Sequence, residues 1–372
     1  MALNTKSQSS PHIALKLLDR QVLTELLGPF LFGVAAFSSI LFAGSYLFRL
    51  TSDVVKGMPM VTAAELLLLY VPEVVVMTLP MATLLAVLLG FGRMSADSEV
   101  VALFAGGTSF YRVVVPVIFF GLFITGLTVV LNEVVTPRTN LASAQLRQRI
   151  LKEPIHSSRP LFLVDRSEGI TSVVVYVQGG YDARTRTLRD VLITGFRENQ
   201  PRIVFRAKLA KWEGGENWSL RDGDWHLLGG GGTQSGTFRK WTAKVVRPEE
   251  VAMAQRTDNQ MTYRELRQFI KYTAGQGGDT AKLEVGLYNK LSLPIASLVF
   301  ALVGAPLGMR KHRGGSSVGL GLSIVIIVAY WMTWHYTVAL SVAGSLHPLV
   351  GAFLADTLGL LVGALLIVRA SK

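Results

Sequence analysis

Six long apolar runs constrain the fold of this 372-residue chain more than any other feature of its sequence. The first uncharged run, residues 26–48, would form a helix about 35 Å long at about 1.5 Å per residue. That length is enough to cross a bilayer core of about 30 Å with some tilt. Further runs of this kind predict spans at residues 63–92, 113–132, 291–309, 317–342 and 349–368. The sequence therefore predicts an α-helical membrane protein with six transmembrane helices.

A polar segment of about 150 residues interrupts the spans between the third and the fourth. It contains short β-branched and aromatic runs separated by glycine and aspartate turns, at residues 171–178, 188–196, 202–212, 218–228 and 236–246. Several short strands at this spacing indicate a β-sandwich or an open jelly roll. A short helix at residues 263–272 is expected to lead back to the membrane. The predicted domains are residues 1–132 with three spans, the β domain 133–282 with its helical connector, and residues 283–372 with three spans.

The Lys and Arg residues of the short loops give the expected orientation, because cytoplasmic loops carry an excess of them. The basic residues expected on the cytoplasmic side are Lys16, Arg20, Arg93, Arg112, Arg310, Lys311, Arg313, Arg369 and Lys372. The opposite short loops carry only Arg49 and Lys56. Both termini are therefore expected in the cytoplasm and the inserted β domain outside it, in the periplasm.

Composition excludes several classes of function. The chain is 50% hydrophobic and 17% charged, which is too apolar for an ordinary soluble protein of this length. Its net charge of +12 is spread without a Lys/Arg-rich tract, so an anionic membrane surface is a better partner than nucleic acid. Cysteine is absent, which excludes disulfides, thiolate zinc sites and cysteine catalysis.

The motifs of catalytic and nucleotide-binding sites are also missing from the sequence. No GxxxxGK[ST], HExxH or GxSxG motif occurs, and the glycine run 229–232 lacks a phosphate-binding lysine and is interpreted as a turn. The six histidines are scattered without metal spacing. His335, among aromatic residues of the fifth span, is either packed or interfacial, or a proton relay. We expect no enzyme activity, no metal and no cofactor bound by this chain.

The segment 95–108, SADSEVVALFAGGT, lies between the second and third spans. Ser95 is expected to cap a helix whose first turn holds Asp97 and Glu99, where the helix dipole favours acids. Val100, Val101, Leu103 and Phe104 form an apolar flank, and Gly106-Gly107 predicts the stop. A helix this short cannot span a bilayer, so we expect it at the cytoplasmic membrane surface, where a separate protein can bind it.

Besides Glu65 at the start of the second apolar run, two acids fall within predicted spans, Glu73 and Asp356. Ionisable groups in lipid are costly and usually face a bundle interior, a cavity or a partner. The alternative is that both lie near the outer interface and reach water. Neither has an obvious intramembrane cation, which argues against an ion-coupled transporter.

The stretch Val71 to Ser109, VPEVVVMTLPMATLLAVLLGFGRMSADSEVVALFAGGTS, resembles the signature of the lipopolysaccharide export permeases, the LptF/LptG family. The similarity includes the Pro-Glu pair, the Leu-Pro, the Gly-x-Gly and the Ser-Glu of the loop. The start, LDRQVLTELL from Leu18, and the region after the β domain are similar too. The resemblance extends over nearly the whole chain, including the order of spans and β domain, and leans slightly towards LptG.

This resemblance implies a transport function. It implies a permease that pairs with a second permease of the family and binds a dimeric cytoplasmic ABC ATPase, which holds ATP and Mg. The complex would extract lipopolysaccharide from the inner membrane, and the β domain would pass it to a periplasmic bridge protein. The first and fifth spans would line the lateral gate.

The resemblance also implies roles for particular residues. The segment 95–108 would be the coupling helix, with Asp97, Glu99, Val100, Leu103 and Phe104 at the ATPase. Without the family pattern, Glu99 is simply a dipole-favoured acid, and Asp97 is a capping charge. Arg49 matches a basic position and would contact lipid phosphate together with Lys56. The alternative for Arg49 is an interfacial anchor.

Two other functions stay open at this point. One is the permease of another ABC system, such as lipoprotein release, although its usual span count and domain placement differ. The other is a membrane-anchored sensor or scaffold whose β domain binds a ligand, a function that would need a cytoplasmic output domain.

Overall fold

The computed structural model describes residues 11–151, 161–163, 172–182, 185–197, 200–228, 234–244, 247–254, 256–275, 278–309 and 316–370. The glycine run 229–232 and the basic residues Arg310, Lys311, Arg313 and Lys372 lie outside these ranges. The chain divides into two compact units. The helical unit contains Met1–Thr51, Val71–Val135 and Tyr288–Lys372, and the β unit contains Ser52–Tyr70 and Thr136–Leu287. The β unit thus includes residues 52–70 in addition to the inserted segment.

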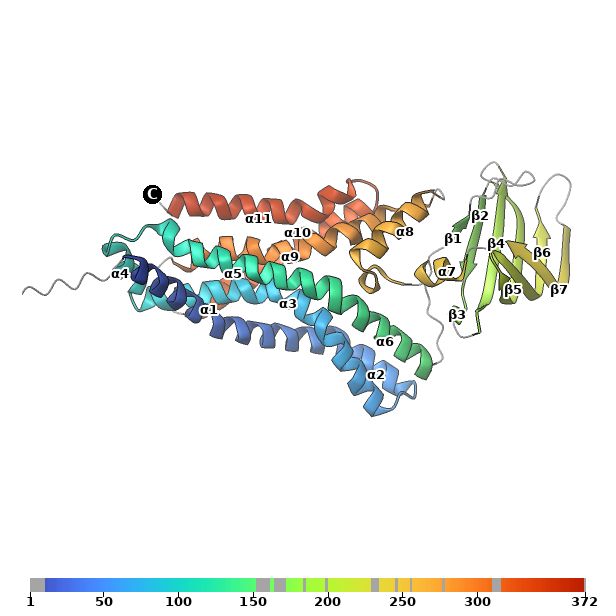
Figure 1. Cartoon of the computed structure of the whole chain (residues 1–372), viewed down its shortest axis with the longest axis horizontal. Helices are drawn as coiled ribbons and strands as arrows, with labels where there is room; N and C mark the ends of the chain where they lie inside the picture. Colours follow the sequence, from blue (N-terminus) through green and yellow to red (C-terminus); the bar gives the residue numbers. More distant parts are fainter. Residues whose placement is uncertain are drawn as a thin grey trace, which may run out of the picture. The chain divides into compact units, whose positions relative to one another are not determined.

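The chain is mainly helical from Pro11 to Leu151 (Figure 1). Helix α1 (Pro11–Leu41) continues through a π turn, Phe42–Tyr46, into α2 (Leu47–Val55). Helix α3 (Met60–Ala96) contains two prolines, and the short α4 (Glu99–Ala105) follows it. Helix α5 (Phe110–Val130) continues through a second π turn, Leu131–Val135, into α6 (Thr136–Leu151).

After the strands the chain returns to helix. Helix α7 (Pro248–Ala254) and a 3-10 turn, Asp258–Gln260, precede α8 (Tyr263–Gly275). The last helices are α9 (Ala281–Gly308), α10 (Ser316–Val342) and α11 (Pro348–Ala370).

Among the described residues, six helices are long and apolar enough to cross a membrane, and together with a separate antiparallel sheet they confirm the predicted fold class. Three of them extend well beyond the predicted apolar runs, and the first covers Leu18–Val55 rather than residues 26–48. Helix α9 begins at Ala281 rather than near residue 291, and the third span continues into α6 as far as Leu151. Both extensions are polar, and a search for apolar runs does not detect helix that continues beyond the lipid.

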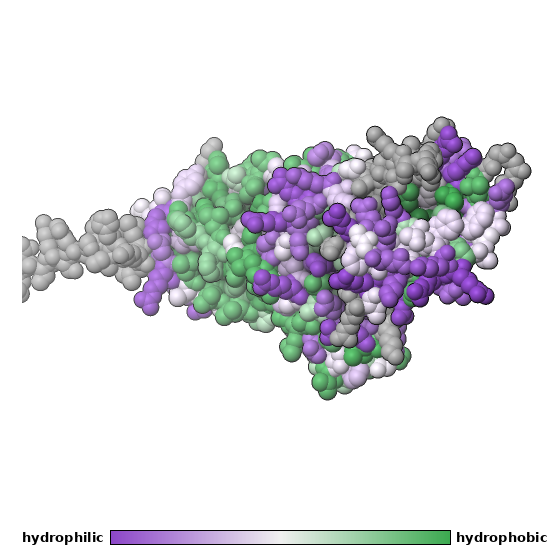
Figure 2. Space-filling view, turned by 45° about the vertical axis from the view of Figure 1, so that its right-hand side comes forward, coloured by the Kyte–Doolittle hydropathy of each residue, from purple (hydrophilic) through white to green (hydrophobic). Residues whose placement is uncertain are grey.

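The helices of the helical unit differ in how deeply they are buried. In the most apolar window of each span, 83% of the residues are buried in α3 and 67% in α9, but only 17% in the α1 span and in α10. Helices α3 and α9 are therefore central, whereas α1 and α10 are peripheral. Figure 2 shows that hydrophobic side chains cover much of the helical surface, as expected where lipid replaces water.

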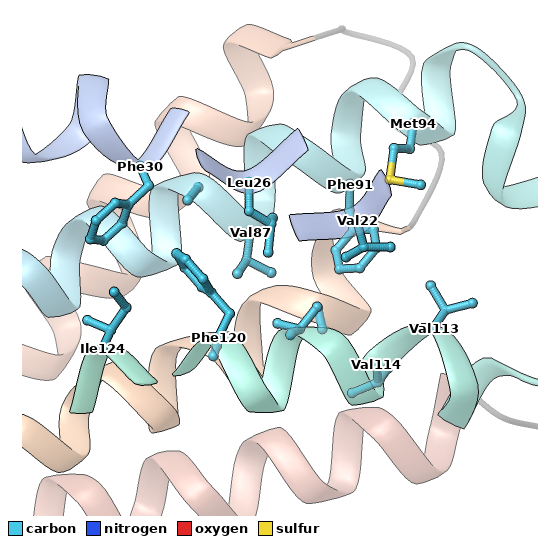
Figure 3. Close-up of a cluster of buried hydrophobic side chains, with 14 of the residues drawn as sticks. Val22, Leu26, Phe30, Val87, Phe91, Met94, Val113, Val114, Phe120 and Ile124 are labelled. Carbon is cyan, nitrogen blue, oxygen red and sulfur yellow. The ribbon is translucent and has the colours of Figure 1, made fainter. Parts of the chain in front are cut away.

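A close-packed cluster joins α1, α3 and α5 (Figure 3). The rings of Phe30 and Phe120 meet edge to face, with 5.3 Å between their centroids. Val22 and Leu26, on the same face of α1, are each 1% exposed and point towards Val87 and Phe91 of α3. The N-terminal half of α1 is therefore fixed to the bundle.

The β unit contains one seven-stranded antiparallel sheet in its described part. The strands are β1 (Leu161–Leu163), β2 (Ser172–Val177), β3 (Tyr181–Asp182), β4 (Thr187–Arg197), β5 (Gln200–Gly214), β6 (Asn217–Leu227) and β7 (Gln234–Lys244). Their order is β1-β2-β4-β5-β6-β7, with β3 paired to β4, so strands close in sequence pair in a meander. Trp218 and Leu220 of the sheet pack in one core with Leu266 and Phe269 of α8.

Close approach of α5 to α9 depends on Gly121. A Cβ atom added there would lie 2.8 Å from the Cβ of Ala301, whereas one added at Gly126 of the same helix would meet nothing within 4 Å. We expect Gly121→Ala to destabilise the protein by about 1–3 kcal/mol, the usual cost of overpacking. Gly126→Ala, the matched control, gains the same helix propensity without the clash. Thermal unfolding in detergent measures both, and equal melting temperatures would contradict this account of the packing.

Glu265 closes the start of α8. Its Oε2 accepts hydrogen bonds from Thr262 N–H (2.8 Å) and Thr262 Oγ1 (3.0 Å), and its Oε1 accepts one from Arg256 (3.2 Å). Burial raises the pKa of Glu265, but the bonds from Thr262 and Arg256 outweigh it and hold that pKa below its ordinary value.

Acid should therefore loosen the first turn of α8. A carboxylate whose pKa is lowered by folding stabilises the fold above its ordinary pKa, and this contribution is lost as the pH falls through the folded pKa. We expect hydrogen exchange of the α8 amides to lose protection in acid in the wild-type chain. In Glu265→Gln this acid-dependent part should be absent, whereas Glu216→Gln, at the exposed β5–β6 turn, should behave as wild type. An unchanged acid response in Glu265→Gln would refute the assignment.

Candidate functional site

The short helix α4 is sharply bounded at both ends. Ser98, directly before it, has a left-handed backbone with φ of 61°. After it, Gly107 has φ of 84°, its N–H donates to Phe104 O, and Thr108 N–H donates to Leu103 O. This is the glycine-terminated helix end that the Gly106-Gly107 pair predicted.

The predicted start of this helix is wrong. Ser95 does not cap α4, because it lies in the last turn of α3, where its Oγ donates to the Met309 carbonyl at 3.3 Å. The α3 helix continues to Ala96, and this tertiary contact on α9 uses the hydroxyl that a cap would need. The helix therefore covers Glu99–Ala105 rather than the expected 95–108.

The two faces of α4 have different surroundings. Val100 is 2% exposed and packs in the cluster with Phe91 and Val113, and Leu103 is partly buried against the same cluster. Val101, which is 56% exposed, and Phe104, which is 38% exposed, face outward. Of the apolar residues expected to contact the ATPase, Phe104 is therefore accessible, whereas Val100 is buried and packs within its own chain. The exposed Val101 was not among the residues expected at the ATPase.

Polar side chains of α1 hold the segment around α4. Arg112 of α5 donates to both carboxylate oxygens of Asp19, at 2.6 and 2.8 Å. Gln21 Nε2 donates to Glu99 Oε2 at 3.1 Å. Arg93 lies 3.5 Å from Glu25 and 3.9 Å from Asp97.

These contacts give a physical meaning to the LDRQVLTELL stretch. Asp19, Gln21 and Glu25 contact α5, α4 and α3 in turn, while Val22 and Leu26 of the same stretch are buried. Sequence reasoning missed all three polar partners. The only signal was the mixture of acids and apolar residues in α1 at helical spacing.

The predicted lipid-contact residues lie in or just after α2. Arg49 and Lys56 are both exposed. Between them, Asp53 is 2% exposed and accepts a hydrogen bond from Arg147 of α6 at 2.8 Å. This partly buried ion pair joins α2 to α6 and was not predicted, because its partners are 94 positions apart.

The predicted intramembrane polar residues differ from one another. Asp356 is 2% exposed and hydrogen-bonded to Ser292 and Tyr330, whereas Glu73 is half-buried in α3. His335 is exposed and lies against the rings of Trp331 and Trp334, with centroids 5.8 and 4.8 Å away.

An aromatic patch lies on one face of the sheet. Phe205 and Trp225 are directly opposite each other on β5 and β6. The Phe205 ring is 6.2 Å from Phe238 and 5.4 Å from Trp241, whose side chain is 46% exposed. Such a surface suits apolar chains, because aromatic side chains bury a large apolar area.

Comparison with known proteins identifies the family. The family model "Lipopolysaccharide export system permease LptF/LptG" matches residues 20–369, a range that begins within α1 and ends within α11. The chain is 23% identical over 318 residues to "Lipopolysaccharide export system permease protein LptG" of Escherichia coli strain K12, covering 82% of this chain and 84% of that protein. The LptG protein of Escherichia coli O6:H1 is similar to the same extent.

The match agrees with the resemblance seen in the residues from Val71 to Ser109, and it extends over both units. The chain belongs to the lipopolysaccharide export system permease LptF/LptG family.

Proposed function

We propose that this chain is a permease subunit of an ATP-driven ABC transporter. It extracts lipopolysaccharide or a related glycolipid from the inner membrane and passes it through its β domain towards the outer membrane. Both termini and α4 lie in the cytoplasm, and the β domain lies in the periplasm. Its partners are a dimeric cytoplasmic ATPase, a second permease of the family and a periplasmic bridge protein.

The build of α4 carries this proposal. A seven-residue helix presents Val101 and Phe104 outward, next to an acid, between two spans. The sequence has no nucleotide-binding motif, so an ATP-driven permease needs a separate motor and a surface on which that motor acts. We assign ATP and Mg to the partner ATPase and no cofactor to this chain.

Glu99 is suited to meet a cation of the partner. Gln21 orients its carboxylate through one hydrogen bond but does not neutralise it, because an amide carries no charge. By contrast, Asp19 and Glu25 each have an arginine partner in this chain. Asp97 already lies near Arg93 and is the weaker candidate.

The lipid path is proposed from burial and chemistry. The α1 span and α10 have the lowest buried share of the six spans, which leaves their sides available to lipid as the two sides of a lateral gate. The exposed Arg49 offers a guanidinium group to lipid phosphate, and Lys56 a second, weaker cation. The patch of Phe205, Trp225, Phe238 and Trp241 offers the β domain a surface for acyl chains.

Charge reversal at Glu99 tests the coupling role. We expect Glu99→Arg to lower the amount of ATPase that co-purifies by at least about tenfold, a loss of about 1.4 kcal/mol. Glu99→Gln keeps an acceptor for Gln21 and removes only the charge, so it should cause a milder loss. Insertion and size-exclusion behaviour should match wild type in both. If Glu99→Arg retains the ATPase and exports lipid normally, the coupling assignment is wrong.

Arg49 is tested by cross-linking lipid to the first span. With a photoreactive residue at Ile40, which is 65% exposed, Arg49→Glu should lower lipid capture by about tenfold or more, as for a lost charge-assisted hydrogen bond. Assembly with the ATPase should be unchanged. Arg49→Lys keeps the charge and should retain most of the cross-link. Equal capture by Arg49→Glu and wild type would show that Arg49 is only an interfacial anchor.

A further inference from the structure

A polar junction joins three spans inside the helical unit. Asp356 of α11 contacts Tyr330 of α10, whose hydroxyl donates to Oδ1 at 2.7 Å. Ser292 Oγ of α9 lies 2.6 Å from Asp356 Oδ2 and 2.7 Å from the Ala352 carbonyl oxygen. Asp356, Ser292 and Tyr330 are 2%, 0% and 8% exposed, so the junction lies in the interior of the helical unit.

The number of protons at this junction decides its charge. Ser292 Oγ is placed to donate to both Asp356 Oδ2 and the Ala352 carbonyl, but its single O–H can point along only one of two contacts this short, so three contacts call for three protons. The hydroxyl groups of Ser292 and Tyr330 supply two protons, and the Ala352 carbonyl supplies none. The remaining donor is the carboxyl group of Asp356.

We infer that Asp356 is a neutral carboxylic acid that pins α10 and α11 to α9. Its Oδ2–H donates to Ser292 Oγ, Ser292 donates to the Ala352 carbonyl, and Tyr330 donates to Oδ1. Every polar group of the junction then has a partner, which is the condition for a buried polar network to stabilise a fold.

The surroundings of the carboxyl group favour the neutral form. In the described part of the chain, no lysine or arginine pairs with Asp356. An ionised carboxylate in a dry membrane interior without a cation is costly, whereas a hydrogen-bonded neutral acid is not. The packing is apolar as well, since the rings of Phe300 and Tyr330 are in contact with centroids 4.8 Å apart.

Close contacts extend the pin along the α10–α11 hairpin. Thr337 Oγ1 donates to the Gly351 carbonyl at 2.8 Å. A Cβ atom at Gly351 would lie 2.7 Å from the Cβ of Ser341, so the two helices touch through small residues. Helices α10 and α11 therefore behave as one body, and Ser292 connects that body to α9.

This arrangement has a consequence for the gate, which rests on the proposed function. If α10 is one side of the lateral gate, its inner face is fixed to α9 and α11 while its outer face meets lipid. Gate opening then moves α10 together with α9 and α11 and does not detach α10 from its own bundle. Asp356 is a positioning residue in this account and does not touch the lipid.

Two variants distinguish a neutral Asp356 carboxyl group from an ionised one. Asparagine reproduces the neutral acid, because its amide N–H donates to Ser292 and its oxygen accepts from Tyr330. Asp356→Leu removes both bonds. The chain lacks cysteine, so spin labels at Leu291 of α9 and Val325 of α10, which are 40% and 64% exposed, report the distance between the helices.

We expect the label distance to stay narrow in wild type and Asp356→Asn and to broaden in Asp356→Leu. Lipid cross-linking should fall by about tenfold in Asp356→Leu alone, as for a lost buried hydrogen bond. If Asp356→Asn broadens the label distance and lowers cross-linking as much as Asp356→Leu does, the inference is overturned, because an ionised carboxylate would then be required.

Infrared spectroscopy of the full chain at neutral pH tests the protonation directly. We expect the carbonyl stretch of a protonated carboxyl group in wild type and its loss in Asp356→Asn. Absence of that band in wild type would overturn the neutral acid. The infrared and label experiments do not depend on transport. They therefore test the neutral Asp356 junction even if lipid is not the cargo and the proposed function fails.

Discussion

The helical unit depends on the close approach of α3 and α9. In a bilayer, lipid tails are as apolar as the helices, so association depends on close packing at small residues and not on the hydrophobic effect. A Cβ atom at Gly304 would lie 3.1 Å from Val87, and one at Gly308 would lie 3.0 Å from Phe91. Because this central pair is tight, the other spans pack around it, and α1 and α10 keep most of their surface free.

The same packing explains why α4 can be both short and ordered. A seven-residue helix is not stable by itself, because helix nucleation is costly and only a few bonds follow it. Here Val100 inserts into the cluster that α1, α3 and α5 already form, and Asp19, Gln21 and Glu25 hold the ends of those helices. A force on α4 therefore reaches α1, the span to which we assign one side of the gate.

The sequence predicts those parts of the fold that depend on local pattern. Six apolar runs gave six helices, and the strand expected at residues 188–196 is β4, Thr187–Arg197. Partners far apart along the chain were not predictable, because no local pattern records them. Asp356 and Ser292 are 64 positions apart, and Asp53 and Arg147 are 94 apart. Likewise, serine is a residue type that often caps helices, but the contact of Ser95 with the Met309 carbonyl depends on where α9 ends.

The hydrogen-bond partners of each acidic side chain in this chain determine what its carboxyl group does. Asp19 faces a guanidinium group at 2.6 Å, so its charge is used within the fold. Glu99 receives one amide hydrogen bond at the surface, which orients the carboxylate without neutralising it, and this is why we propose it as the contact for a cation of the partner. Asp356 is buried, accepts from the Tyr330 hydroxyl and, in the neutral form that we infer, donates to Ser292 Oγ, so one uncharged carboxyl group connects three spans. Residue type is the same in the first and last cases, so the role of a carboxyl group in this family cannot be assigned without identifying the donors around it.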